Sequence, residues 1–226
     1  MKYVASIKPG TSILVVILFL LSITFYQVSF AADKMDDFSP DEIVAELKPK
    51  LELDDQQVKN LTTALGELGK QLHALIEKQE AAKEEDDSED FIKGVKQAQA
   101  DYQKKLKGIL TDKQLQTYNE LKEADIMDMM KDLAEIKLLD IQPKIGFSDE
   151  QLDKLVPVMA TSMRGFMKIA WENAGKHLRL RHKIKIAKKL KHIQSDAQKQ
   201  VQQILTGEQY QKWEELKKQQ QEQQKK

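Results

Sequence analysis

Residues 204–216, with the sequence ILTGEQYQKWEEL, decide the predicted fold because they occur twice. The earlier copy is residues 109–121, ILTDKQLQTYNEL, and the corresponding glutamines, Gln114 and Gln209, are 95 residues apart. In each copy a threonine precedes the glutamine by three residues, which is the spacing of a capping box. The threonine hydroxyl accepts a hydrogen bond from a backbone N–H of the first helical turn, and the glutamine side chain accepts one from the threonine N–H. Each copy therefore predicts the start of a helix.

Two further sites carry the same frame in a weaker form. Residues 53–58 read LDDQQV and residues 147–152 read FSDEQL, with aspartate or serine in place of threonine. All four sites follow the order apolar residue, capping residue, two variable residues, glutamine. Two pairs of matching sites at a nearly constant separation predict an internal duplication. The residues of this frame are Leu53, Asp54, Gln57, Leu110, Thr111, Gln114, Phe147, Ser148, Gln151, Leu205, Thr206 and Gln209.

The composition is that of a helical protein. The chain has 226 residues, of which 32% are charged and only 6% are aromatic, and it has few glycines and prolines. No stretch after residue 31 alternates apolar and polar residues as a half-buried strand would. The absence of cysteine excludes disulfides, thiolate-bound metal sites and cysteine nucleophiles. These observations predict an all-α fold built from two tandem antiparallel helical-hairpin units.

The duplication also predicts the domain boundaries. The first helical repeat covers residues 40–138 and the second covers residues 139–216, followed by a polar Gln- and Lys-rich tail at 217–226 that should fray. Helix limits follow from the caps, from apolar residues spaced three or four apart and from the prolines. Pro157 is expected to kink or interrupt its helix. The helices are expected at about 40–49, 54–82, 89–109, 111–139, 149–171, 175–204 and 206–216.

Residues 1–31 have the features of a secretory signal. Two lysines precede an apolar core at residues 13–23, and small residues precede a cleavage site after Ala31. We expect a flexible N-terminus at residues 32–39 and a protein that lies outside the cytoplasm. An uncleaved membrane anchor remains an alternative, because the segment is long enough to span a bilayer.

The formal net charge of zero hides two oppositely charged halves. Residues 32–137 contain 16 Lys and 26 Asp or Glu, whereas residues 138–226 contain 18 Lys or Arg and 10 Asp or Glu. The acidic run EEDDSED at 84–90 corresponds in position to a basic run at 176–191 in the second repeat. We therefore hypothesise that the two runs form an electrostatic clasp within an intrachain pseudo-dimer.

The capping frame resembles the LTXXQ motif of the Spy/CpxP family of periplasmic stress proteins. The match is at residues 110–114, LTDKQ, and 205–209, LTGEQ, with weaker forms at 53–57 and 147–151. The resemblance covers most of residues 40–216, but in two consecutive copies where the family usually has one. It implies an elongated or cradle-shaped protein, as a homo-oligomer or an intrachain pseudo-dimer. It also implies a periplasmic holding chaperone of the stress response, which binds unfolded proteins without ATP.

A binding surface for unfolded clients is predicted on the second repeat. Three methionines fall four residues apart on one helical face, and flexible methionine suits surfaces that bind varied partners. Beyond them, the basic run at 176–191 would steer acidic clients. A methionine stripe at this spacing is also typical of a core, so its exposure is left open. The predicted client-binding residues are Met159, Met163, Phe166, Met167, Trp171, Arg179, Arg181 and Lys183.

Other functions have less support. The main alternative is a regulator or adaptor that binds one sensor kinase or envelope protein through the same surface. A metal-binding sensor is weaker, because His177 and His182 are five residues apart and do not share a helical face. The export signal and the acidic first half argue against nucleic-acid binding. No catalytic motif and no cofactor is predicted, so the chain is not expected to be an enzyme.

Overall fold

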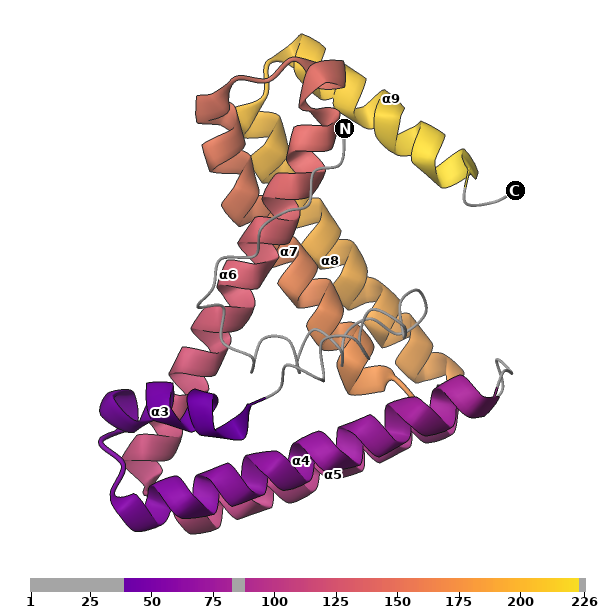
Figure 1. Cartoon of the computed structure of the whole chain (residues 1–226). Helices are drawn as coiled ribbons and strands as arrows, with labels where there is room; N and C mark the ends of the chain where they lie inside the picture. Colours follow the sequence, from indigo (N-terminus) through magenta and orange to yellow (C-terminus); the bar gives the residue numbers. More distant parts are fainter. Residues whose placement is uncertain (1–38, 83–87, 224–226) are drawn as a thin grey trace. The chain divides into compact units, whose positions relative to one another are not determined.

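The computed structural model describes residues 39–82 and 88–223 and is built from helices (Figure 1). No strand occurs in this described part of the chain, so the predicted all-α fold is confirmed. None of its helices combines the length and apolar composition needed to cross a bilayer. The predicted signal at residues 1–31 lies outside the described residues. The helices are α3 (Pro40–Leu51), α4 (Asp55–Ala82), α5 (Ser88–Ile109), α6 (Asp112–Ile145), α7 (Asp149–Asn173), α8 (Leu180–Ile204) and α9 (Gly207–Gln223).

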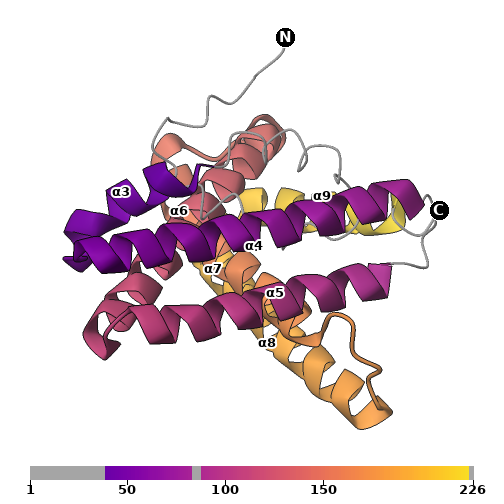
Figure 2. The same ribbon diagram turned by 60° about the horizontal axis from the view of Figure 1, so that its bottom comes forward.

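The described residues divide into two compact units, with the division between Ile126 and Met127. In the first unit α3 packs on α4, and α4 runs side by side with α5 (Figures 1 and 2). Apolar residues three or four apart form a stripe along each helix, and packing removes that stripe from water. The innermost side chains of this unit are Val44, Leu61, Leu65, Val95, Leu106 and Tyr118.

The second unit packs α7 against α8, and α9 contacts α8. Its core lies where the C-terminal part of α6 meets the first turns of α7 and the last turns of α8. Partly buried side chains from α9, including Tyr210 and Trp213, cover this core. The buried residues are Leu138, Ile145, Phe147, Leu152, Leu155, Val201 and Leu205.

Helix α6 belongs to both units. Its N-terminal part follows a threonine capping residue, Thr111, as α9 follows Thr206. Its C-terminal part is followed by a residue of positive φ, Gly146, as α3 is followed by Glu52. Val44 in α3 and Leu138 in α6 are 94 residues apart and both are fully buried. One continuous helix thus supplies the last helix of the first unit and the first helix of the second.

Prolines limit the helices less than expected. Helix α3 continues past Pro49 to Leu51, α6 continues past Pro143 to Ile145, and α7 is not interrupted at Pro157. All three prolines are exposed, so water can reach the carbonyl that each proline leaves without a backbone donor. Of the two effects expected at Pro157, a kink or an interruption, the interruption does not occur.

Two other helix limits also differ from expectation. Helix α8 begins at Leu180 rather than near residue 175, where Gly175 has φ 66° and is not helical. Helix α9 continues to Gln223, although residues 217–226 were expected to fray. Gln, Lys and Glu are good helix formers, which sustain a helix without a buried stripe.

Candidate functional site

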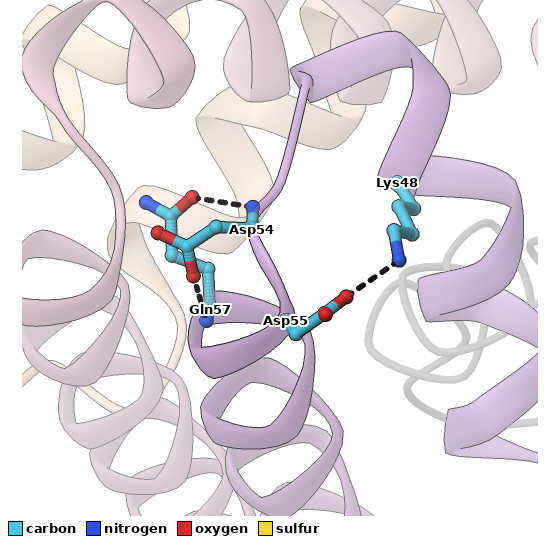
Figure 3. Close-up of polar contacts among 4 residues, drawn as sticks. All are labelled: Lys48, Asp54, Asp55 and Gln57. Atoms are coloured by element: carbon cyan, nitrogen blue, oxygen red, sulfur yellow. Dashed lines mark hydrogen bonds and ion pairs between the residues drawn. The ribbon is translucent and has the colours of Figure 1, made fainter.

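The capping frame forms the hydrogen bonds that the sequence predicts. At the start of α4, the Gln57 N–H donates to Asp54 Oδ1 at 2.7 Å, and the Asp54 N–H donates to Gln57 Oε1 at 3.1 Å (Figure 3). The same two bonds join Ser148 and Gln151 at the start of α7, at 3.3 and 2.9 Å. The predicted capping boxes at Thr111 and Thr206 are likewise present.

The glutamines also bond across the first unit, which sequence reasoning missed. Gln57 Nε2 donates to Gln114 Oε1 at 2.8 Å and to the carbonyl of Ile109, the last residue of α5, at 2.9 Å. Gln114 Nε2 donates to the carbonyl of Leu51, the last residue of α3, at 3.0 Å. Each glutamine therefore caps the start of its own helix and the end of another, so the pair joins four helix termini.

The second unit repeats this arrangement. Gln151 Nε2 donates to Gln209 Oε1 at 2.9 Å and to the carbonyl of Ile204, the last residue of α8, at 2.9 Å. Gln209 Nε2 donates to the carbonyl of Gly146, just after α6, at 2.7 Å. We call Gln57 with Gln114, and Gln151 with Gln209, the glutamine pairs. Their hydrogen-bonding capacity is used by backbone and by each other, so they organise the fold rather than bind a ligand.

A second contact is also repeated around each pair. Lys48 Nζ in α3 lies 2.9 Å from Asp55 Oδ1 in α4 (Figure 3). The equivalent residues 94 positions later are Gln142 and Asp149, and Gln142 Nε2 donates to Asp149 Oδ1 at 3.1 Å. The ion pair of the first unit is thus an amide–carboxylate hydrogen bond in the second.

The first unit buries a pair of tyrosines that the sequence did not reveal. The hydroxyls of Tyr102 and Tyr118 are 3.2 Å apart, and both side chains are buried. Burial raises the pKa of Tyr118 to about 12 and raises the pKa of Tyr102 well above its usual value. Both hydroxyls therefore stay protonated at neutral pH, and they satisfy each other as hydrogen-bonding partners.

The predicted methionine stripe is only partly buried. Met159 packs against the core of the second unit, whereas Met163 and Met167 are partly buried further along α7. Phe166 leaves 36% of its surface exposed, and Trp171 is partly buried. The stripe therefore begins in the core and ends at a surface.

The predicted basic residues Arg179, Arg181 and Lys183 are all exposed, at the start of α8. Two aliphatic side chains near them in the sequence are also exposed. Leu180 is 73% exposed and Ile184 is 48% exposed. Ile184 therefore lies outside the partly buried apolar stripe of its helix. The i, i+4 spacing of Leu180 and Ile184 between cations was the signal that sequence reasoning overlooked.

Exposed apolar side chains have an uneven distribution. Among the described residues, every large apolar side chain that is clearly exposed belongs to the second unit. These residues are Ile136, Leu139, Phe166, Leu180 and Ile184. We call the part of this set on α7 and α8, together with Met163, Met167 and the neighbouring cations, the open face.

The hypothesised clasp and the metal-binding alternative do not contribute to the open face. The acidic side of the hypothesised clasp falls largely at residues 84–87, which are outside the described residues. Within the described ranges, no group of three or more His, Asp or Glu side chains is placed to hold a metal ion.

Comparisons of the chain with protein-family models, with curated proteins and with solved structures found no significant match.

Proposed function

We propose that this protein is an exported holding chaperone of the Spy/CpxP type, which binds partly unfolded proteins on its open face without ATP. The observation that carries the proposal is the concentration of exposed large apolar side chains in the second unit. Apolar patches on a protein surface commonly mark sites of protein association. In this proposal two Spy-like hairpin units in one chain take the place of a dimer.

The chemistry of the open face suits varied and poorly ordered partners. Met163 and Met167 have three rotatable bonds each and adapt to different apolar side chains. Phe166 adds a rigid aromatic contact beside them. The exposed cations at 179, 181 and 183 attract acidic segments and accelerate encounter.

The test is light scattering by an aggregating client. We expect equimolar protein to suppress the aggregation of two or three unrelated, chemically unfolded clients in the absence of nucleotide. The Phe166→Glu variant places a charge on the open face and should lose most of this protection. Ala74→Glu, at an exposed position of α4, is the matched control and should retain it. Circular dichroism of both variants checks that they fold.

Unchanged aggregation with all of these clients would contradict the holding function. Capture of a single folded sensor kinase or envelope protein through the open face, lost in Phe166→Glu, would then support the regulator instead. Export is tested separately by the intact mass of the protein recovered from the cell envelope. We expect the mass of a chain that begins at Ala32, whereas the full-length mass would indicate an uncleaved anchor.

A further inference from the structure

Residues 176–191, which run from just before α8 into its N-terminal half, form a strongly basic surface. Residues 176–191 contain eight Lys or Arg and no Asp or Glu, and all eight cations are exposed. Among the described residues, no ion pair involves any of these eight cations. A dense set of like charges is costly in isolation and favours an anionic partner.

Helical spacing divides this segment into two faces. The inward face carries Ile186, Leu190 and Ile193, which are partly buried, and it leads to buried Val201. The outward face consists of residues three or four apart around Ile184. Its members, all exposed, are Leu180, Arg181, Ile184, Ala187, Lys188 and Lys191. We call these six residues the cationic face.

The start of the helix adds to the electrostatic cost. Arg179 and Arg181 lie at the positive end of the helix dipole, where acidic residues would be favourable. No capping side chain satisfies the first N–H groups of α8. The sequence therefore places cations at a helix start where helix stability alone disfavours them.

We propose that the cationic face binds the surface of a bilayer that contains anionic lipid, with Leu180 and Ile184 entering the interface between headgroups and acyl chains. A basic amphipathic helix whose aliphatic residues point outward has the chemistry of interfacial membrane binding. The charge complements anionic headgroups, each cation adding to the attraction. Nucleic-acid binding would use the same cations but would give the two exposed aliphatic side chains no role. This inference does not depend on client holding.

The absence of cysteine from the chain allows a local test in the full-length protein. An Ile184→Cys variant is labelled with an environment-sensitive fluorophore and mixed with vesicles of phosphatidylglycerol and phosphatidylcholine, or of phosphatidylcholine alone. We expect a blue shift and a rise in intensity with the anionic vesicles only. The same label at Ala74→Cys, exposed on α4, controls for any tethering by another part of the chain and should not respond.

Charge variants then test the contribution of the face. Adding Lys188→Gln and Lys191→Gln to the labelled chain should raise the anionic lipid concentration for half-maximal response by about tenfold. Lys59→Gln with Lys78→Gln, on α4, gives the same change in net charge and should alter it less than about twofold. A Leu180→Cys label, which leaves Ile184 intact, should report the same insertion.

Three results would overturn the inference. The labels at 180 and 184 could fail to respond to anionic vesicles, or respond equally to neutral ones. The response could also arise from soluble polyglutamate but not from vesicles, which would identify an acidic polypeptide as the partner. Because light scattering of clients contains no lipid, failure here is distinguishable from failure of the holding function.

Discussion

The α5 and α8 helices occupy equivalent places in the two units but bury very different amounts of their apolar stripes. Five positions of α5 are all buried, namely Ile92, Val95, Ala98, Tyr102 and Leu106. The positions 95 residues later are Ala187, Leu190, Ile193, Ala197 and Val201, of which only Val201 is buried. In α8, the apolar position next to the glutamine pair is therefore buried as in α5, whereas the positions further from the pair are more exposed than in α5.

The partner helices α4 and α7 also differ at one position far from the glutamine pair, although Ile169 of α7 is buried. Leu61 and its equivalent 94 residues later, Leu155, are both fully buried. Three turns further on, Leu72 is 4% exposed, whereas its equivalent, Phe166, is 36% exposed. Both comparisons find apolar side chains at the far end of the second unit that are more exposed than their equivalents in the first.

The largest expected effect is the loss of unfolding free energy when a core side chain is truncated, and it should differ between the two units. Leu65→Ala removes a fully buried side chain of α4 and should lower the free energy of unfolding of the first unit by about 2–5 kcal/mol. Met159→Ala, at the equivalent position of α7, should cost only about 1–2 kcal/mol, since Met159 is partly buried. Denaturant unfolding measures both variants, and equal costs would contradict the difference in burial.

Alkaline pH should affect the first unit selectively. The unfolded pKa of tyrosine is about 10, whereas burial raises that of Tyr118 to about 12 in the folded state. The folded state thus holds its proton more tightly, so stability is intact below pH 10 and falls by about 2 kcal/mol as the pH rises to about 12. The second unit has Trp213 and Ala197 at the equivalent positions and lacks this titration.

Unfolding at pH 9 and near pH 12 checks this dependence. Tyr102→Phe with Tyr118→Phe removes both phenols and should lose the tyrosine contribution, while the general effect of lysine deprotonation stays. A double variant with the same alkaline loss as the unchanged protein would show that the pair is not responsible.

Removal of a capping glutamine should have similar effects in the two units. Gln57→Ala leaves the Ile109 carbonyl without its side-chain donor and removes one of the hydrogen bonds to Gln114 Oε1, and should cost about 1–3 kcal/mol. Gln151→Ala should cost about the same, because its contacts to Ile204 and Gln209 match. A double-mutant cycle over Gln57 and Gln114 should show coupling of about 0.5–1.5 kcal/mol. Additive losses would mean that the two amides act independently.

The smallest expected effects concern the residue that ends the first helix of each unit. Glu52 has φ 52° and its equivalent, Gly146, has φ 80°, in the left-handed region that glycine tolerates best. Glu52→Gly should therefore stabilise the first unit by about 0.5–1 kcal/mol. Gly146→Ala should destabilise the second by about 1 kcal/mol, although a Cβ there would have no neighbour within 4 Å. Thermal unfolding resolves both shifts, and shifts of the opposite sign would contradict the equivalence.

The local features of the fold were predictable from the sequence, and the long-range ones were not. Helix starts at Asp54, Thr111, Ser148 and Thr206 follow from contacts between residues three apart. The glutamine contacts across each unit join residues more than 50 positions apart, which no local pattern reveals. Exposure of Ile184 was also hidden, because apolar spacing does not show whether a partner covers the stripe.

The most direct test of the account is backbone amide hydrogen exchange in the protein alone and with an unfolding client. Residues 163–173 of α7 and the equivalent residues 69–79 of α4 are compared. We predict faster exchange at 163–173 in the protein alone, and a client-induced slowing confined to 163–173 and the start of α8. Equally slow exchange in both segments, or protection by the client at 69–79, would contradict the claim that the second unit alone carries the open binding surface.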